Sequence, residues 1–339
     1  MSTNRHFWSD APACGWATYL WRTVAGRVSA PTVLPPSQAL SPYADAVHPR
    51  LQLDGIMSED AEEYSRFIEE HFYSVDSVGT LPIKMRLPKT LLEQRLGDGS
   101  WIGVSARTHN RRLVGCVFSK YAGFYERYEA GIVDYLCVAP THRKTGVADA
   151  LLRSLYVECM RRTQQRAVQF FRKEGAFKPL PPIWHDLYYG RPILRGLNSY
   201  SVEHGVFDRK LWTDYVNHKP AEDILLHDHR NIPSEIRYAF YGAVYVLYKP
   251  TYEYGPGEEA GRAILVDWWS LDSHIPLKEL EESVLIIMDS LPYNYVYAPS
   301  VFPTVKTGYW RVEGTIGMYV FHLDPGVPFK RAVRSAVSW

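Results

Sequence analysis

The chain has 339 residues, a length that suits two domains or one large one. Its 38 basic and 37 acidic residues give a formal net charge of +1, so the strong positive charge of a nucleic-acid-binding protein is absent. No apolar run is long enough to cross a membrane, and the start MSTNRHFWSD has no hydrophobic signal region. We therefore expect a soluble cytoplasmic protein with no integral membrane segment.

Residues 1–49 predict an irregular arm. Prolines recur along it and interrupt helices. Phe7, Trp8 and Trp16 nevertheless make the arm too apolar for a disordered tail. We expect the arm to lie on the folded body, where it either covers core surface or closes over a ligand.

Two helices are expected next. The first covers residues 54–73, with Ser58 as its N-cap, acids in its first turn, and a stripe of apolar residues that faces the core. That stripe consists of Tyr64, Phe67, Ile68 and Phe72. A second helix is expected near residues 88–96.

A hairpin follows, with strands at 101–108 and 112–121 joined by the turn His109-Asn110-Arg111. Val114, Cys116 and Phe118 alternate along the second strand, which predicts a half-buried strand. A further strand at 129–138, a helix at 145–163 and a strand at 167–171 complete this half of the chain.

Residues 175–198 mix prolines with aromatic residues and predict a shaped loop. From Tyr200 the same plan starts again, as a second and degenerate copy of the first topology. Its expected helices are 207–216, a short piece near 221–227, and 276–291, the last with an apolar stripe from Leu277 to Met288. Its expected strands are 236–248, 262–270, 293–298 and 315–323.

No metal site is expected. The four cysteines show no C-x-x-C spacing, and most lie in apolar patterns that predict buried free thiols. They are Cys14, Cys116, Cys137 and Cys159. The run His227-Asp228-His229 does not suit a metal either, because adjacent residues on an extended segment point to opposite faces.

The most informative stretch is 132–153, IVDYLCVAPTHRKTGVADALLR. It predicts a strand, a basic turn and a helix, and the free N–H groups at a helix N-terminus suit a phosphate. The spacing R-x-x-G-x-A, from Arg143 to Ala148, resembles the acetyl-CoA signature of the GNAT acyltransferases. The alternative is an ordinary basic turn between a strand and a helix.

Taken together, several segments resemble the N-myristoyltransferases, which are built from two fused GNAT-like halves. Phe7-Trp8-Ser9-Asp10-Ala11-Pro12 is similar to that family's N-terminal F-W-x-x-x-P segment, and Tyr135-Leu136-Cys137-Val138 to its F-L-C-V strand end. Lys178-Pro179-Leu180-Pro181 with Trp184-His185, and Leu247-Tyr248-Lys249-Pro250-Thr251, resemble two further motifs, and residues 53–77 resemble the family's first helix. The order of these motifs carries the resemblance across most of the chain.

The resemblance implies a mixed-sheet α+β fold of two tandem GNAT-like halves. Residues 1–49 would contribute to the acyl-CoA site, 50–199 would bind acyl-CoA, and 200–339 would bind the peptide. It implies a monomeric enzyme that transfers a myristoyl group from myristoyl-CoA to the N-terminal glycine of peptides or proteins. Acyl-CoA is then a co-substrate, with no tightly bound cofactor.

The resemblance also implies roles for residues of the central stretch. The backbone amides of Tyr135 and Leu136 would stabilise the oxyanion formed during transfer. The CoA pyrophosphate would lie on the amides of the turn, with the charges of Arg143 and Lys144 beside it. The residues implied in CoA binding are Phe7, Trp8, Val138, Arg143, Lys144, Thr145, Gly146, Val147 and Ala148.

The base that takes the proton from the amine is, in the resembled family, the C-terminal carboxylate. Here it would belong to Trp339, although a frayed terminus is the alternative. Asp134 replaces an asparagine of that family, and it could anchor the acceptor ammonium, act as a substitute base, or be an ordinary strand residue. Burial would raise the pKa of its carboxyl group.

The acceptor side departs from the family pattern. The threonine of its Y-T-A-G motif is missing from residues 169–175, and its acidic loop is reduced to one acid within residues 74–80. Trp184, His185 and Tyr248 are the candidate substrate contacts, with a structural role for His185 as the alternative. Other aromatic residues would line a groove in the second half or pack in its core; they are Phe240, Tyr245, Trp268 and Trp269.

Two other functions stay open at this point. One is an acyltransferase of the same fold with another donor or acceptor, such as acetyl-CoA and a small amine. The other is a protein that binds acyl-CoA or a lipopeptide without catalysis.

Overall fold

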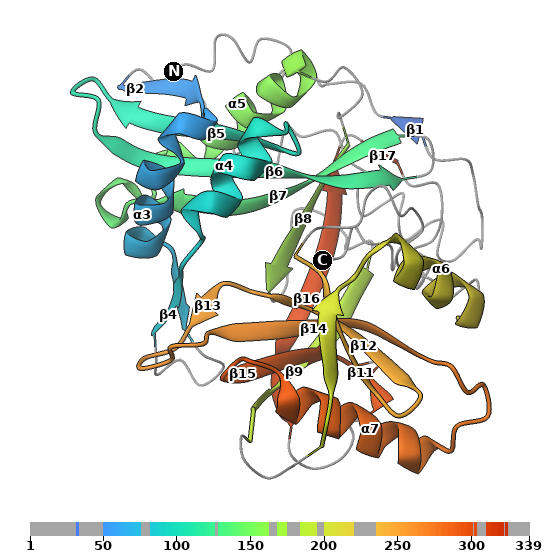
Figure 1. Cartoon of the computed structure of the whole chain (residues 1–339). Helices are drawn as coiled ribbons and strands as arrows, with labels where there is room; N and C mark the ends of the chain where they lie inside the picture. The colour runs from blue at the N-terminus through green and yellow to red at the C-terminus, as the bar shows by residue number, and fades with distance from the viewer. Residues whose placement is uncertain are drawn as a thin grey trace, which may run out of the picture. The chain divides into compact units, whose positions relative to one another are not determined.

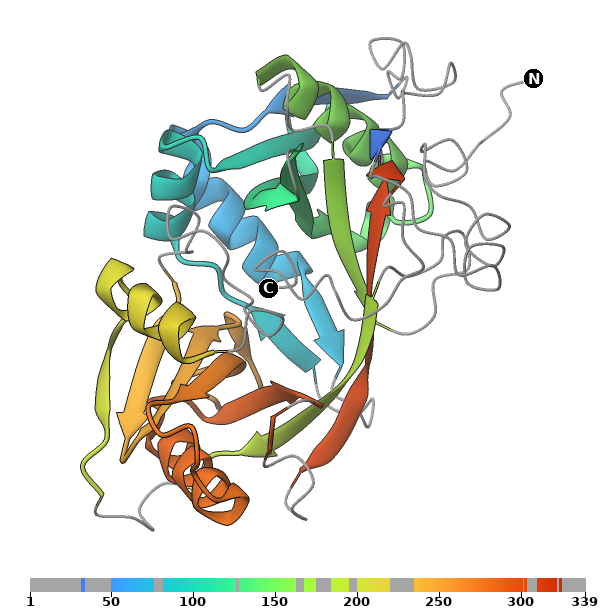
Figure 2. The ribbon, with the colours of Figure 1, turned by 90° about the vertical axis from the view of Figure 1, so that its right-hand side faces the viewer.

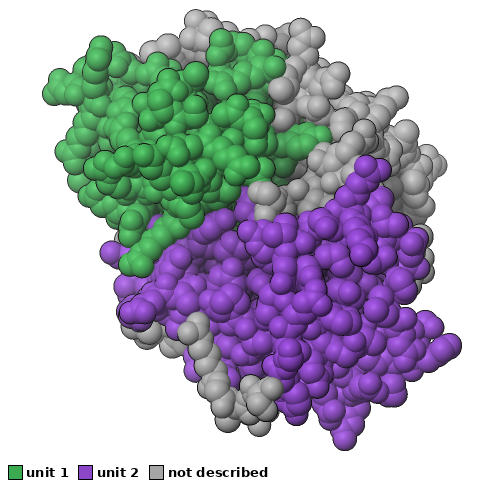
Figure 3. Space-filling model, in the orientation of Figure 1, with its two compact units in different colours: residues 1–73, 86–185, 317–333 green, residues 74–85, 186–316, 334–339 purple. Residues whose placement is uncertain are grey.

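The computed structural model describes residues 32–33, 50–75, 82–125, 128–162, 168–174, 184–194, 200–219, 235–300, 302–303, 310–321 and 323–324. Two compact units divide the chain, and Figure 3 colours them separately. The first unit holds residues 1–73, 86–185 and 317–333, and the second holds 74–85, 186–316 and 334–339. The predicted helical piece at 221–227, His227 to His229, most of the arm and the C-terminal tail lie outside the described residues.

The first unit is built around an antiparallel sheet with one parallel pair. Its strands follow the order β2 (Leu51–Gly55), β5 (Trp101–Thr108), β6 (Leu113–Tyr125), β7 (Tyr128–Val138) and β8 (Val168–Glu174). The pair β7–β8 is parallel, and α5 (Val147–Arg162) is the helical crossover that such a pair requires. Figure 1 shows this crossover in green.

Helices cover both faces of this sheet. On one face α5 packs on β5 and β6, and on the other lie α3 (Ala61–His71) and α4 (Lys89–Gly97), as Figure 2 also shows. Tyr64 of α3 meets Phe118 of β6 edge-on, with 6.5 Å between ring centroids. Consequently β6 is buried from Leu113 to Ser119, and the half-buried strand predicted there is wrong. Val114, Cys116 and Phe118 alternate along β6, but the residues between them are buried as well, because the other face of the sheet is also covered.

The start of the first unit also differs from the predicted helix at 54–73. Residues 51–55 form β2, because Leu51 and its neighbours pair with β5. A short turn at Ser58–Asp60 then leads into α3, whose N-terminal flanking residue is Asp60. Ser58 is therefore not the cap, and its hydroxyl donates instead to Glu59 Oε2 at 3.4 Å.

The second unit repeats this plan. Its strand order is β10 (Glu203–Val206), β11 (Arg237–Tyr241), β12 (Val244–Pro250), β14 (Arg262–Ser270), β15 (Tyr295–Pro299) and β9 (Trp184–Pro192). The pair β14–β15 is parallel and α7 (Leu277–Ser290) is its crossover. The predicted mixed α+β fold, with a second copy of the first topology, is confirmed.

The remaining elements are short or shared. In the second unit α6 (Arg209–His218) contacts β14, and β13 (Glu253–Tyr254) pairs with β4 (Pro82–Met85). In the first unit β1 (Thr32–Val33) pairs with β17 (Leu323–Asp324). β3 (Tyr73–Val75) joins β4 in a small sheet, and β16 (Arg311–Phe321) passes from the second unit to the first.

Two predictions need correction for strands that lie in the second unit. The stretch predicted as a loop at 175–198 contains β9, which pairs with β15 through Tyr295↔Pro192. Pro192 is the last residue of the strand, and the other prolines of the stretch precede Trp184 in the sequence, so none falls inside the paired segment. The single run predicted at 236–248 is a hairpin of β11 and β12, in which Gly242 supplies the positive φ of 61° at the turn.

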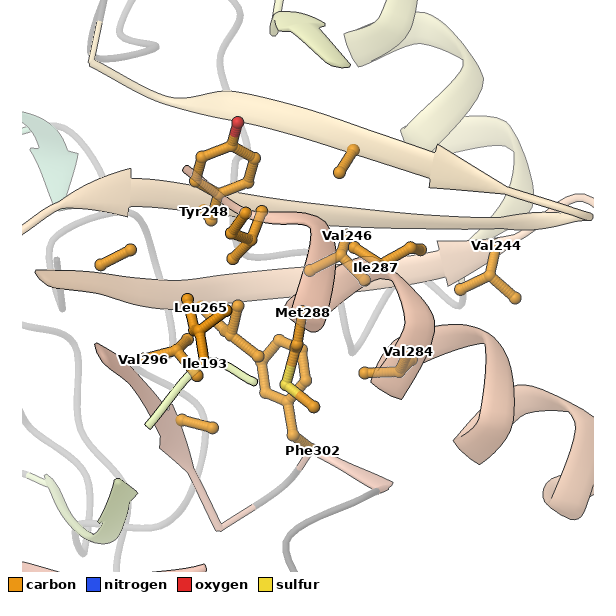
Figure 4. Close-up of a cluster of buried hydrophobic side chains, with 14 of the residues drawn as sticks. Ile193, Val244, Val246, Tyr248, Leu265, Val284, Ile287, Met288, Val296 and Phe302 are labelled. Atoms are coloured by element: carbon orange, nitrogen blue, oxygen red, sulfur yellow. The ribbon is translucent and has the colours of Figure 1, made fainter. Parts of the chain in front are cut away.

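The core of the second unit lies between α7 and the strands, as Figure 4 shows. Val284, Ile287 and Met288 of α7 are completely buried. They pack on strand residues such as Val246 and Leu265. The predicted apolar stripe is confirmed from Leu280 onward, but Leu277 is the first residue of α7 and is 63% exposed.

The described residues include three of the four cysteines. Cys116, Cys137 and Cys159 are buried free thiols, as predicted, and Cys14 lies outside this part of the chain. No helix among the described residues is both long and apolar enough to cross a membrane.

Replacement of Ile287 by alanine should lower the free energy of unfolding by about 2–5 kcal/mol, because the side chain is fully buried and its loss leaves a cavity. The matched change Ile287→Val removes one methyl group and should cost about 0.5–1.5 kcal/mol. Urea denaturation followed by tryptophan fluorescence measures both. Equal effects of the two changes would contradict the packing described for α7.

Candidate functional site

A cavity of about 620 Å³ opens in the first unit, where β7 ends and α5 begins. Its wall combines the end of α3, the last residues of β7, the turn and the first turn of α5. The lining residues are His71, Phe72, Leu136, Cys137, Val138, His142, Arg143, Lys144, Gly146, Val147, Ala148 and Asp149. The predicted joint of strand, basic turn and helix is thus the wall of one cavity.

The turn between β7 and α5 has an unusual backbone. Lys144 has a positive φ of 61° and Gly146 one of 89°, in the region that glycine adopts most easily. Gly146 O accepts the N–H of Ala150 at 3.0 Å, which is the first turn of the 16-residue helix α5. The amides of the residues before Ala150 therefore lie at the open N-terminus of this helix. Such amides and the helix dipole favour an anion.

Arg143 holds the turn in place as well as giving it charge. Its Nε donates to Val138 O at 3.0 Å and its Nη2 to His71 O at 3.1 Å. It therefore ties the end of β7 to the C-terminal end of α3, where a cation is favoured by the helix dipole. Thr145 acts inside the turn, since its hydroxyl donates to His142 O at 2.7 Å.

A β-bulge interrupts β7 just before the cavity. Cys116 pairs with Cys137 and Phe118 with Asp134, so Tyr135 and Leu136 together face the single residue Val117. Tyr135 has a positive φ of 51°, which is strained for a tyrosine. Strain of this kind concentrates at functional sites, and here it falls on the residues predicted as oxyanion donors.

The bulge carries a small charge cluster. Asp134 Oδ1 accepts the backbone N–H of Tyr135 at 2.9 Å. Asp134 Oδ2 accepts from Lys120 Nζ at 2.8 Å and from Arg172 Nη2 at 3.3 Å. The exposed fractions of these side chains are 19% for Asp134, 14% for Lys120 and 29% for Arg172. Two cations, one from each strand beside β7, thus face one carboxylate.

These partners reverse the effect of burial on Asp134. Burial alone would raise the pKa of the carboxyl group, but the charges of Lys120 and Arg172 and the hydrogen bonds of Lys120 and Tyr135 hold it well below its usual range. The raised pKa expected from the sequence is therefore wrong. A carboxylate this acidic holds protons weakly and is a poor general base at neutral pH.

The Tyr135 side chain belongs to the core rather than to the cavity. Its ring lies 5.6 Å from the ring of Trp101 and 6.4 Å from that of Phe118, and Lys120 Nζ lies 5.0 Å from its centroid. Only the backbone of Tyr135 is therefore placed to take part in a site at the bulge.

The first unit therefore brings together most of the residues predicted on the central stretch. Leu136, Val138, Arg143, Lys144 and the segment 146–148 line the cavity, and Asp134 and Tyr135 lie at its bulge. Phe7, Trp8 and Trp339 lie outside the described residues. The backbone of Trp184 and His185 begins β9, but their side chains are not described.

The aromatic residues predicted for the second half belong largely to its core. Tyr248 is 4% exposed and packs with the cluster under α7, and its hydroxyl lies 3.5 Å from His204 Nδ1. Trp269 is 2% exposed and stacks on Tyr245, with 4.5 Å between centroids. Within this unit, Trp269 and Tyr248 therefore pack in the core and do not line a groove.

Five cavity residues were not predicted as site residues from the sequence; of these, Phe72 was predicted to face the core and Cys137 to be a buried thiol. His71 and Phe72 come from the end of α3, His142 from the turn, and Asp149 from the first turn of α5. Only His142 and Asp149 were within reach of a local argument, because they adjoin the R-x-x-G-x-A spacing. The contribution of α3 depends on the contact between Arg143 and His71 O, which no local pattern reveals.

The cavity also contains a thiol. Burial raises the pKa of Cys137 to about 12, although the nearby charge of Arg143 lowers it. The thiol therefore stays protonated at neutral pH and is a weak nucleophile.

Comparison with solved structures places the whole chain in one fold. A crystal structure of Saccharomyces cerevisiae N-myristoyltransferase with bound myristoyl-CoA superposes with a TM-score of 0.63 at 11% identity, and 97% of each chain is covered. A second structure of that enzyme, with myristoyl-CoA and inhibitors, gives 0.58 at 12% identity over 99% of this chain and 96% of the other. No protein-family model matches the sequence, and no curated protein matches it. At this identity the comparison shows the fold, and it confirms the predicted two-halved architecture.

The Asp134 cluster predicts a dependence of stability on pH. Because the pKa of Asp134 is lower in the folded protein than in the unfolded chain, its carboxylate stabilises the fold above the unfolded value of about 3.9. That contribution is lost as the pH falls through the folded pKa. Asp134→Asn should lower the unfolding free energy at pH 7 by about 2 kcal/mol, between the values for exposed and buried ion pairs. The variant should also lose stability less steeply below pH ~4, which urea titrations at several pH values would measure. Parallel pH profiles for both proteins would contradict the ion pairs.

Proposed function

We propose that the protein is an acyl-CoA-dependent N-acyltransferase, with a myristoyl group as the donor and the N-terminal glycine of a peptide or protein as the acceptor. One observation carries the proposal. The strained bulge at Tyr135 and Leu136 and the turn at 143–148, here called the anion cradle, adjoin a single cavity. They lie within a fold shared with N-myristoyltransferase over 97% of the chain. The donor and acceptor named here go beyond the fold and rest on the motif resemblance.

The cavity has the features that an acyl-CoA needs. The amides at 144–148, with the charges of Arg143 and Lys144, would hold the pyrophosphate. Leu136 and Val138 form the apolar wall that leads from this cradle to the bulge and would hold the pantetheine arm. The thioester would then lie at the amides of Tyr135 and Leu136. Asp149 also lines the cavity, so its carboxylate must lie away from the phosphates.

The reaction at the bulge would be a direct transfer. The neutral amine attacks the thioester carbon, a C–N bond forms, and the carbonyl oxygen becomes an oxyanion that the two amides stabilise. Collapse of this intermediate breaks the C–S bond and releases CoA. One fixed amide donor is worth about 3 kcal/mol of barrier in comparable sites. Cys137 is a poor candidate for an acyl-enzyme, because its thiol stays protonated.

The α-amino group of a peptide has a pKa of about 7.7–8.0 and must lose a proton before it attacks. Asp134 is a poor base, since it is ion-paired to Lys120 and Arg172. The proposal therefore keeps the C-terminal carboxylate of Trp339 as the base. This assignment comes from the resemblance.

The first experiment incubates the purified protein with myristoyl-CoA and a panel of peptides that start with glycine. Mass spectrometry should find a product that carries one myristoyl group on the N-terminal amine. Thermal shift with acyl-CoAs of increasing chain length separates the donors. Stabilisation that stops growing at two carbons indicates an acetyl donor, and binding without any product indicates a protein that only binds acyl-CoA.

Gly146→Val tests the cradle. A valine strains a backbone with a φ of 89°, so the turn should open and the Kd for myristoyl-CoA should rise by about tenfold to a hundredfold, or about 1.4–2.8 kcal/mol. The control is Gly257→Val, which introduces a similar strain at a φ of 74° in the second unit. Isothermal titration calorimetry should find an unchanged Kd for the control. An equal loss in both variants would mean that the cradle does not hold the ligand.

Removal of residues 337–339 tests the base. The truncated protein should bind myristoyl-CoA with unchanged Kd but transfer the acyl group more slowly, by about 100-fold to 10,000-fold, the usual contribution of a general base. Its rate should rise with pH as the acceptor amine loses its proton. If transfer survives truncation unchanged, Trp339 is not the base.

A further inference from the structure

The two units share an aspartate with the same local geometry. In each unit it lies near the end of the strand that leads into the helical crossover, on β7 for Asp134 and on β14 for Asp267. Each accepts the backbone N–H of the next residue, at 2.9 Å for Tyr135 and 2.8 Å for Trp268. The next residue is aromatic in both units.

A lysine pairs with each aspartate. Lys120 Nζ contacts Asp134 and lies 5.0 Å from the Tyr135 ring, and Lys219 Nζ contacts Asp267 and lies 5.9 Å from the Trp268 ring. The two lysines come from different kinds of element: Lys120 lies on the preceding strand β6, and Lys219 directly follows α6. The cluster around Asp267 is thus the counterpart, in the second unit, of the cluster around Asp134.

In the second unit this cluster is closed. Tyr215 OH donates to Asp267 Oδ2 at 2.7 Å, and Tyr215 is completely buried. The side chains of Asp267 and Lys219 are 8% and 11% exposed. The contacts of Asp267 come from Tyr215, Lys219 and the following amide, so the cluster fastens α6 to β14. Its role is structural.

In the first unit the cluster is more open and its third partner is a cation. Arg172 takes the place that Tyr215 has beside Asp267, and its side chain is 29% exposed. The cluster around Asp134 consequently carries two positive charges and one negative charge. The amide that Asp134 holds is that of Tyr135 at the bulge, the group assigned above to the oxyanion.

An N–H group has one hydrogen to donate. While Asp134 Oδ1 accepts it at 2.9 Å, the N–H of Tyr135 is directed at the carboxylate and not at a thioester oxygen. The carboxylate oxygen thus stands where the oxyanion would form. Transfer through this donor requires Asp134 to move away from it.

We propose that Asp134 is a positioning residue that occupies the Tyr135 amide until the acceptor ammonium attracts its carboxylate, so that the oxyanion site is complete only when both substrates are bound. This inference rests on the proposed function. It gives the cluster a purpose that the closed cluster of Asp267 lacks: bound acyl-CoA is protected from water until the amine arrives. Assembly of a site by the correct substrate is a general device for specificity.

Two reactions compete for the bound thioester. In transfer, the ammonium loses two protons, the nitrogen bonds to the acyl carbon, and the C–S bond breaks. One proton neutralises the CoA thiolate and the other goes to solvent. In hydrolysis, water supplies the oxygen of a carboxylate and the C–S bond breaks; one proton of the water goes to the CoA thiolate and the other to solvent. Occupation of the amide by Asp134 slows the second reaction.

The test uses the double variant Asp134→Ala/Lys120→Met of the full chain. The variant loses one negative and one positive charge, and Arg172 keeps the net charge of the cluster at that of the native protein. The variant should therefore fold, which its melting temperature checks. Hydrolysis of myristoyl-CoA without acceptor should rise about tenfold because the amide is vacant. The KM for a glycyl peptide should rise by a similar factor, since its ammonium has lost its partner.

The matched control is Asp267→Ala/Lys219→Met, which removes the equivalent bonds in the second unit. It should lower the melting temperature and leave hydrolysis without acceptor unchanged. An Asp134 variant that is folded and hydrolyses myristoyl-CoA at the native rate, or more slowly, overturns the inference. A rise of the same size in the control also overturns it.

A second measurement does not depend on turnover. Myristoyl-CoA labelled with ¹³C at the thioester carbonyl is bound to each protein without acceptor, and the carbonyl stretch is recorded by infrared difference spectroscopy. The stretch should move to lower frequency in the Asp134 variant, where the carbonyl gains the amide donor, and an identical frequency in both proteins contradicts the inference. Absence of myristoyl-CoA binding to the native protein would refute the proposed function instead.

Discussion

The bulge at Tyr135 and Leu136 is the feature on which the candidate site depends. Two residues of β7 face one residue of β6 there, and the left-handed backbone of Tyr135 is a strained conformation. The strain persists because the ring of Tyr135 packs against Trp101 and Phe118, and because β7 pairs with β6 on both sides of the bulge. Rigidity of this kind is what an oxyanion donor requires, since a donor that must reorganise during the reaction stabilises the transition state less.

The anion cradle downstream depends on the same strand. Arg143 bonds to Val138 O at the end of β7 and to His71 O at the end of α3, so the position of the turn follows from two elements that are already packed in the core. The positive φ angles of Lys144 and Gly146 then bring the chain into α5 with its first amides at the cavity. Arg143 keeps its positive charge while it bonds to these two neutral carbonyl groups, so it both positions the turn and adds charge to it. In the proposed function, the backbone amides of the turn, aligned by a helix, would attract the phosphate.

The sequence predicted what depends on neighbours along the chain and missed what depends on pairing across it. The strand, turn and helix from Ile132 to Arg153 were predictable because apolar alternation, a glycine and a helical stripe lie in one continuous run. β9 was missed because its partner, β15, lies about a hundred residues away, and proline content dominated the local pattern. The pKa of Asp134 was predicted in the wrong direction because its partners Lys120 and Arg172 come from two other strands. The spacing of residues in the sequence does not reveal the register in which those strands pair with β7. Tyr248 was named from a motif, yet burial under α7 is a property of the second unit's whole core.

The two units show how one plan can serve different purposes. Both have an antiparallel sheet, a helical crossover to a parallel strand, and an aspartate on the strand before the crossover. In the second unit Tyr215 is completely buried beside Asp267, and burial raises the pKa of that aspartate despite its bond to Lys219. In the first unit a second cation replaces the tyrosine, and the pKa of the aspartate falls. A carboxylate that is always ionised and partly exposed can exchange one cation for another, whereas one enclosed by a tyrosine and a lysine cannot do so without disturbing the packing of α6. The structural role of Asp267 and the proposed movement of Asp134 thus differ because of one partner, buried Tyr215 in the second unit and partly exposed Arg172 in the first.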